Sequence, residues 1–250
     1  MMGAILPPWA HAGGVEATLE RLRSASERER MREAMLARSR SSWDNFWKWS
    51  GPEGIIISDI PSGRRSAVVG KNLLEAATVS RKAASGISEA DVAEFAFDLL
   101  AEERMGVGMI SFSQSEEVVK KILQEPYVNI CTDGLLGGKP HPRAYGTYPR
   151  ILGRYAREEN LVTLEQAVRQ MSGLAAETFQ LDGYGCIAVD AIANLVVFDP
   201  ERVIDRATFE DSKQYPEGIR CVIVQGREVI SGDKQYAGSG VAVRSATSRA

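Results

Sequence analysis

Histidine and cysteine are scarce in this 250-residue sequence, and no apolar run approaches the length of a membrane span. The three cysteines show no CxxC spacing, so a disulfide framework is excluded and reduced thiols are expected. The two histidines, His11 and His141, share neither a predicted helix nor an HxH spacing. Two histidines placed in this way are few for a metal-dependent hydrolase.

Strong charge of either sign is also missing. The net charge of −3 and the absence of a basic tail argue against a nucleic-acid binder or an anionic-membrane binder. The first residues, MMGAILPPWAHAGG, lack the basic start and the long apolar stretch of a signal peptide. We therefore expect a soluble, cytoplasmic protein with neither nucleic acid nor membrane among its partners.

Helices and strands alternate in the first half of the predicted structure. Pro7 and Pro8 predict an irregular start over residues 1–12. Ser88 and Asp91 form a capping box for a helix with a clear apolar stripe. The other patterns predict helices from residue 14, over 26–40, about 70–84, 88–104 and 115–124, and strands over 54–60, 107–112 and 128–132. The strand–helix–strand order from 107 to 132 predicts a right-handed parallel βαβ unit.

The style of the sequence changes near residue 183. Before it, helices are predicted over 150–159, 163–171 and 175–179. After it, short strands are predicted over 185–189, 194–199, 220–225 and 228–230, the last two joined by a hairpin turn at Gln225–Gly226–Arg227. We expect a parallel α/β part followed by a small β unit, with a frayed tail from Gly238.

Four aromatic residues cluster in SWDNFWKWS, namely Trp43, Phe46, Trp47 and Trp49. Such a cluster lines an apolar ligand pocket or seals a small subdomain, and we favour packing.

The candidate catalytic and binding residues lie close together in one stretch, residues 128–150, VNICTDGLLGGKPHPRAYGTYPR. An apolar run ends at Asp133, and a glycine-rich loop then carries Lys139, His141 and Arg143. Polar loops after buried strands are where α/β folds place their active sites. Two plainer readings stand beside this one, because Asp-Gly is a common turn and Arg143 could be a surface ion-pairing residue. We interpret Cys131 as a small buried hydrophobe.

Five segments together resemble a known family: PPWAHAGG, CTDGLLGGKPHPRAYGTYPRILGRYARE, NLVVFDP, ATFEDSKQYPEGI and VIVQGREV. They look like the carboxyl-terminal half of the N-acyl-D-amino-acid deacylases, or D-aminoacylases, of the amidohydrolase superfamily. The resemblance implies an α/β fold, the carboxyl-terminal part of a metal-dependent (β/α)8 amidohydrolase barrel plus strands of a small β-sandwich domain. It suggests a lid-like segment with helices and the aromatic cluster over 1–60, the last βα units over 61–182, sandwich strands over 183–238 and a frayed tail over 239–250.

The same resemblance implies a reaction. A zinc-activated water attacks the linear amide of an N-acyl-D-amino acid, with Asp133 touching the metal and shuttling the proton as general base and acid. Arg143 is the residue expected to hold the substrate carboxylate, since a guanidinium fits a carboxylate bidentately. His141 and Tyr145 are candidate substrate-binding residues or loop structure, Lys139 and Tyr145 are open between site and scaffold, and His11 is assigned neither role.

The sequence also departs from the family pattern. The resemblance implies an HxH pair, a further ligand such as cysteine and two later histidines, and it implies a glycine where this chain has Asp190. Apart from Asp133 the expected metal ligands are absent, so we expect a truncated member whose partner is a missing amino-terminal half or another subunit. The alternatives are a non-catalytic remnant, and a cyclic amidase of the dihydroorotase or hydantoinase kind.

Overall fold

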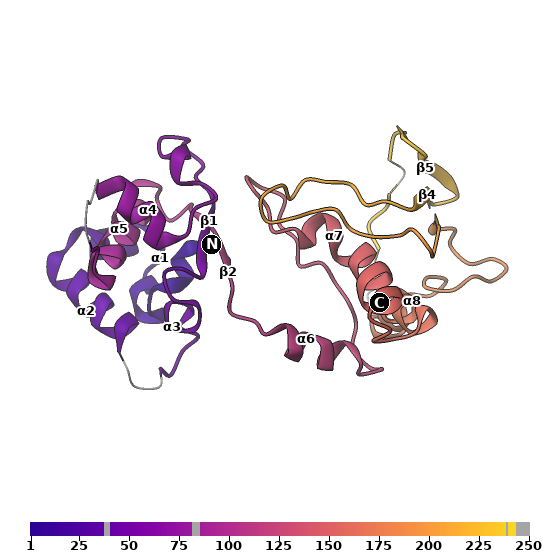
Figure 1. Ribbon diagram of the computed structural model, residues 1–250, viewed down its shortest axis with the longest axis horizontal. Helices are drawn as coiled ribbons and strands as arrows, with labels where there is room; N and C mark the ends of the chain where they lie inside the picture. Colours follow the sequence, from indigo (N-terminus) through magenta and orange to yellow (C-terminus); the bar gives the residue numbers. More distant parts are fainter. Residues whose placement is uncertain (38–40, 82–85, 239, 244–250) are drawn as a thin grey trace. The chain divides into compact units, whose positions relative to one another are not determined.

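The computed structural model describes residues 1–37, 41–81, 86–238 and 240–243, and the chain forms two compact units (Figure 1). Unit 1 consists of Met1–Gln114 with Leu136–His141, and unit 2 of Ser115–Leu135 with Pro142–Ala250. Each unit has its own sheet and its own apolar core. The expected segment borders near residues 60 and 182 therefore lie within the two units, and most of the expected tail lies outside the described residues.

Unit 1 is mainly helical and follows the predicted order of elements. Its elements are 3-10 helices Met2–Ile5, Pro8–His11 and Ser66–Val68, helices α1 (Gly14–Arg23), α2 (Ala25–Leu36), α3 (Phe46–Ser50), α4 (Leu73–Arg81) and α5 (Glu89–Glu102), and strands β1 (Ile55–Asp59) and β2 (Gly108–Ser111). The expected irregular start is wrong. Pro8 occupies the first helical position, where a missing N–H costs nothing. The predicted ends of α2 and α4 lie outside the described residues.

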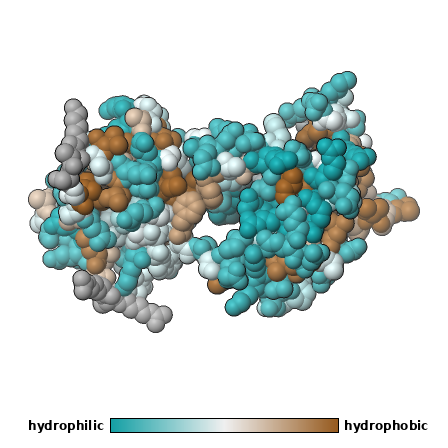
Figure 2. Space-filling view, in the orientation of Figure 1, coloured by the Kyte–Doolittle hydropathy of each residue, from teal (hydrophilic) through white to brown (hydrophobic). Residues whose placement is uncertain are grey.

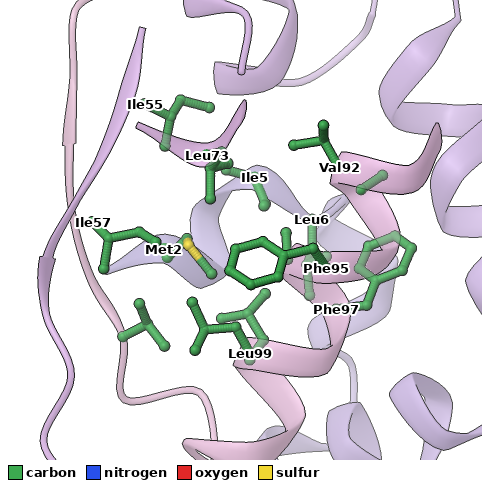
Figure 3. Packing of buried hydrophobic residues seen from close by; sticks show 14 of the residues in the cluster. Met2, Ile5, Leu6, Ile55, Ile57, Leu73, Val92, Phe95, Phe97 and Leu99 are labelled. Atoms are coloured by element: carbon green, nitrogen blue, oxygen red, sulfur yellow. The ribbon is translucent and has the colours of Figure 1, made fainter. Parts of the chain in front are cut away.

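Helix α5 forms the centre of the unit 1 core. Its capping box is confirmed, with the Ser88 side chain accepting from Asp91 N–H and the Asp91 side chain accepting from Ser88 N–H. The stripe Val92, Phe95, Ala96, Leu99 and Leu100 is buried as predicted. Figure 3 shows side chains of α5, of β1 and of the first 3-10 helix pointing into one cluster. Every buried residue of this core is at most 5% exposed, so the packing is dense.

The aromatic cluster belongs to the same packing. Trp47 is 2% exposed, and its indole Nε1 donates to Glu89 Oε1 at 2.8 Å. Burying an indole usually requires such a partner for its N–H. Trp49 is half exposed and contacts Phe46 edge to face, with ring centroids 5.2 Å apart. Trp47 thus confirms the packing interpretation.

The predicted parallel βαβ unit is wrong. Strand β2 pairs antiparallel with β1, with Ile56 opposite Ile110, in a two-stranded sheet. Residues 128–132 do not form a strand, and Cys131 is exposed rather than buried. An apolar run indicates that a segment can form a strand. The run does not identify the second strand with which that segment pairs.

Unit 2 contains the helices α6 (Glu116–Leu123), α7 (Arg143–Arg150), α8 (Leu164–Met171) and α9 (Gly173–Thr178), and a π-helix Ile151–Glu158 that continues α7. The capping box of α8, made by Thr163 and Gln166, is confirmed. The helix predicted from residue 150 begins earlier, at Arg143, so the polar loop ends at Pro142. Pro149 lies inside this helix and has no N–H to donate, and the wider π-helical bonding follows directly after it.

One face of this long helix packs against the segment 200–205. A Cβ on Gly153 would lie 2.4 Å from the Val203 carbonyl oxygen, so only glycine allows this approach. Arg157 Nη1 donates to the same carbonyl at 2.7 Å. Arg150 Nη2 lies 2.8 Å from the carboxylate of Asp205, whose side chain is buried. Arg150, Gly153 and Arg157 therefore all contact the segment 200–205.

The β unit of the second half is a four-stranded antiparallel sheet in the order β3-β4-β5-β6, of which Figure 1 labels β4 and β5. Its strands are β3 (Leu195–Phe198), β4 (Ile219–Val224), β5 (Arg227–Ser231) and β6 (Lys234–Gln235), and none of their residues is buried. The hairpin turn is confirmed, with positive φ at Gln225 and Gly226. The strand predicted over 185–189 is not formed. Asp190 adopts a φ of 66°, the backbone region that its expected glycine counterpart would favour.

Both sheets of the described residues are antiparallel, so the parallel strands of the expected barrel are not seen there. Figure 2 shows a largely hydrophilic surface with smaller apolar patches. Among the helices of the described residues, none combines the length and apolarity that crossing a membrane requires.

Candidate functional site

Asp133 and Arg143 form an ion pair beside the start of α7. Arg143 Nη2 donates to Asp133 Oδ2 at 2.7 Å. The Asp133 side chain is 80% exposed and that of Arg143 is 42% exposed, so both are accessible to a ligand. The two strongest site predictions from the sequence are thus placed together in unit 2.

The backbone around Asp133 is shaped by close contact with α7. Asp133 has a φ of 43°, in the left-handed region that aspartate tolerates better than most residues. At Gly134 an added Cβ would lie 2.7 Å from the Ala144 Cα, so this residue must be glycine for the segment to lie on the helix. Residues 133 and 134 form neither a turn nor a bend, so the plainer reading as an Asp-Gly turn is wrong. The contact of Gly134 with Ala144 instead holds the Asp133 carboxylate beside Arg143.

The segment leading to Asp133 is held by α8. The Ile130 N–H donates to the Gln170 carbonyl oxygen at 3.1 Å. The Gln170 side chain donates to the carbonyl oxygens of Leu123 and Glu125 at 3.0 and 2.9 Å. Sequence reasoning did not identify Gln170. The available signal was a glutamine three residues after Ala167, on the buried face of an otherwise amphipathic helix.

Lys139 and His141 belong to unit 1 and are not grouped with the ion pair. The Lys139 N–H donates to the Ser58 carbonyl oxygen at 2.9 Å, at the end of β1. His141 is half-buried. His11 also lies in unit 1, where its Nε2 is 3.1 Å from the Gly3 carbonyl oxygen.

Tyr145 lies on α7 and contacts Tyr215 edge to face, with ring centroids 6.3 Å apart. Two residues along a helix correspond to a rotation of about 200°, so Tyr145 and Arg143 point to different sides of α7. This contact is a scaffold contact between α7 and the QYPEG segment. The substrate role of Tyr145 stays a prediction.

Two phenols near α7 are held in their protonated form. Burial, with a smaller contribution from Cys131, raises the pKa of Tyr148 above its ordinary value. Burial and then the hydrogen bond to Glu116, at 2.7 Å, raise the pKa of Tyr155 to about 12. At neutral pH these phenols can donate hydrogen bonds but cannot serve as bases.

The described residues do not fit a metal ion. Across residues 1–37, 41–81, 86–238 and 240–243, no three His, Cys, Asp or Glu side chains come together in a way that could hold one. Asp133 supplies one carboxylate, and a guanidinium rather than a second ligand lies against it. A zinc site needs three or four protein ligands.

Comparison with known proteins gives concordant matches. The model of the amidohydrolase family matches residues 63–230. The sequence is 44% identical over 128 residues to a D-aminoacylase of Alcaligenes xylosoxydans xylosoxydans, covering 51% of this chain and 26% of the relative. It is 43% identical over 120 residues to an N-acyl-D-glutamate deacylase of the same organism, covering 48% of this chain and 25% of the relative.

Solved structures agree with the sequence matches. A crystal structure of D-aminoacylase, described as defining a novel subset of amidohydrolases, has a TM-score of 0.63 and 30% identity, covering 94% of this chain and 46% of that one. N-acyl-D-glutamate deacylase from Bordetella bronchiseptica, complexed with zinc and a phosphonate inhibitor, has a TM-score of 0.61 and 33% identity, covering 72% and 35%. The chain thus shares the α/β amidohydrolase fold and spans from about a quarter to less than half of the relatives it matches.

Proposed function

This chain belongs to the amidohydrolase family, and we propose that it supplies part of the active site of a hydrolase that cleaves the linear amide bond of N-acyl-D-amino acids. The observation that carries the proposal is the Asp133–Arg143 pair, at 2.7 Å and open to solvent. Relatives named D-aminoacylase and N-acyl-D-glutamate deacylase support the substrate class.

Each residue of the pair has a distinct role in this proposal. Arg143 binds the substrate carboxylate through two parallel N–H donors, which distinguishes a free acyl-amino acid from an internal peptide bond. Asp133 takes the proton of the attacking water and returns it to the departing amine, because amide cleavage stalls with an unprotonated leaving group. His141 and Tyr145 remain proposed substrate contacts.

Zinc is the cofactor we propose for the complete enzyme, since the related N-acyl-D-glutamate deacylase is complexed with it. The described residues do not fit the metal, so in this proposal the further ligands come from outside them. The same argument applies to the (β/α)8 barrel and the β-sandwich, which the described residues would only complete in part.

The test compares the chain alone with the chain mixed with the amino-terminal half of a deacylase relative, both with zinc. N-acetyl-D-glutamate and N-acetyl-D-leucine are the substrates, and their L-enantiomers are controls. We expect hydrolysis of a D-substrate only in the mixture, its loss with Asp133→Asn, and its retention with the matched exposed control Asp182→Asn.

Two results would contradict the proposal. Equal activity of Asp133→Asn and the native chain would remove Asp133 from the reaction. A folded chain that gives no hydrolysis in any mixture would favour the non-catalytic alternative, whose specific support is the missing ligand set. Ring opening of a hydantoin or dihydroorotate in place of acyl-amino-acid cleavage would favour the cyclic amidase.

A further inference from the structure

We infer that Gln170 is a positioning residue that sets where the Asp133 carboxylate lies. The inference rests on the proposed function only for the role of Asp133. Its physical content, that a buried amide on α8 fixes the segment carrying Asp133, is independent of that role.

Gln170 holds the segment 123–130 at three points. Its side-chain Nε2 donates to the Leu123 carbonyl oxygen at 3.0 Å and to the Glu125 carbonyl oxygen at 2.9 Å. Its backbone carbonyl oxygen accepts from the Ile130 N–H at 3.1 Å. One residue of α8 therefore binds the end of α6 and the segment that reaches Asp133 three residues later.

The orientation of this amide is determined by its surroundings. Gln170 is 3% exposed, so its polar atoms exchange few hydrogen bonds with solvent. Both N–H groups of Nε2 face carbonyl oxygens, and the reversed amide would place Oε1 against those same acceptors. Among the described residues, Oε1 has no hydrogen-bond partner. Leaving Oε1 buried without a partner costs free energy of folding. We infer that the two hydrogen bonds donated by Nε2 offset this cost.

The segment before Asp133 has three kinds of contact with the rest of unit 2: the Gln170 bonds, the packing of Ile130 in the core and the bond from Asn129 Nδ2 to Thr178 Oγ1 on α9 at 3.0 Å. Residues 128–132 belong to no strand in the described structure. On the other side of Asp133, Gly134 packs directly against Ala144. Asp133 thus lies between the contacts that residues 129 and 130 make with α8, α9 and the core and the contact of Gly134 with α7, and loosening the contacts on α8 moves the carboxylate relative to Arg143.

The test uses Gln170→Met, which keeps an unbranched side chain of similar length and removes both donated bonds. Gln166→Met is the matched control, because Gln166 lies on the same helix and its side chain accepts from the Thr163 N–H away from the segment 123–133. Both variants lose side-chain-to-backbone bonds on α8. Gln170→Met removes two of the three bonds to the segment 123–130 and keeps the third, because the Ile130 N–H donates to the backbone carbonyl of residue 170.

Nuclear magnetic resonance of the whole chain provides the main measurement. We expect the Ile130 amide to exchange with solvent at least tenfold faster in Gln170→Met, with altered ¹³C shifts of the Asp133 carboxyl and the Arg143 guanidinium carbon. Gln166→Met should leave all three signals unchanged. Unchanged signals in Gln170→Met, or equal changes in both variants, would overturn the inference.

A second variant keeps the test decisive if Gln170→Met does not fold. Gln170→Asn retains the amide but shortens its reach by one methylene, and the same shifts are expected. In any mixture that hydrolyses an acyl-amino acid, Gln170→Met should lower kcat at least tenfold with little change in KM, because Arg143 stays anchored on α7. Absence of hydrolysis with altered signals would contradict the proposed function alone; hydrolysis with unaltered signals would contradict the positioning role alone.

Discussion

The cores of the two units differ in how completely their residues are buried. Every buried residue in the core of unit 1 is at most 5% exposed, whereas most of those in unit 2 are between 5% and 9% exposed. Both units have close backbone contacts, as at Gly54 in unit 1 and Gly153 in unit 2, and side chains that bind carbonyl groups, as Asn45 does in unit 1 and Gln170 in unit 2. The exposed pair Asp133–Arg143 lies in unit 2. The candidate site thus lies on the unit whose core is less completely buried.

The aromatic residues allow the two units to be observed separately. All four tryptophans lie in unit 1, at positions 9, 43, 47 and 49. All seven tyrosines lie in unit 2, at positions 127, 145, 148, 155, 184, 215 and 236. Tryptophan fluorescence therefore reports on unit 1, and tyrosine absorbance changes report on unit 2.

The largest effect is expected from Phe97→Ala in the core of unit 1. Phe97 is fully buried, and truncating a buried phenylalanine costs about 3–5 kcal/mol of unfolding free energy. The tryptophan transition in denaturant should shift strongly, and the tyrosine transition much less. Val79→Ala, at an exposed position of α4, is the control. Equal shifts of both transitions would mean that the units unfold together and would end the comparison.

Gly153→Ala should act on unit 2 in the same assay. The added Cβ would meet the Val203 carbonyl oxygen at 2.4 Å, and overpacking of this kind costs about 1–3 kcal/mol. The tyrosine transition should move to lower denaturant. Gly238→Ala has no neighbouring atom within 4 Å and should be neutral. A neutral Gly153→Ala would show that close backbone contact does not stabilise this unit.

The two capping boxes offer a matched pair. Ser88→Ala removes the cap of α5 in unit 1, and Thr163→Ala removes the cap of α8 in unit 2. Each should cost about 1 kcal/mol, because one N–H of the first turn loses its acceptor. Denaturant titration should show the first loss in the tryptophan signal and the second in the tyrosine signal. The reverse assignment would contradict the division into units.

The last prediction concerns the pH dependence of the stability of unit 2. The pKa of Tyr155 is raised from about 10 to about 12, so the folded unit binds this proton more tightly than the unfolded chain does. The resulting stabilisation is present below pH 10 and is lost as pH rises through about 12. Tyr155→Phe should weaken this alkaline decline of the tyrosine transition, and the exposed control Tyr215→Phe should not. An identical decline in both variants would contradict the assignment.

Local patterns predicted much of the helical structure. Ser88 with Asp91 and Thr163 with Gln166 were sufficient to place the starts of α5 and α8, because a capping box involves residues three apart. The hairpin turn at Gln225–Gly226 was found for the same reason. The strands over 128–132 and 185–189 were predicted wrongly, since a strand exists only with a neighbour and local sequence does not identify that neighbour. The prediction that Cys131 is buried was also wrong, because it depended on the predicted strand over 128–132.

The candidate site likewise has features that the sequence predicted and features that only the tertiary structure showed. Asp133 and Arg143 were named from sequence, because the stretch over 128–150 that carries both resembles a motif of the deacylase family. Their ion pair, the contact of Gly134 with Ala144 and the anchor at Gln170 were decided only by tertiary structure. Helix α8 reaches the segment before Asp133 from about 40 residues further along the chain. Contacts at that distance depend on how elements pack, and local sequence does not encode packing by itself.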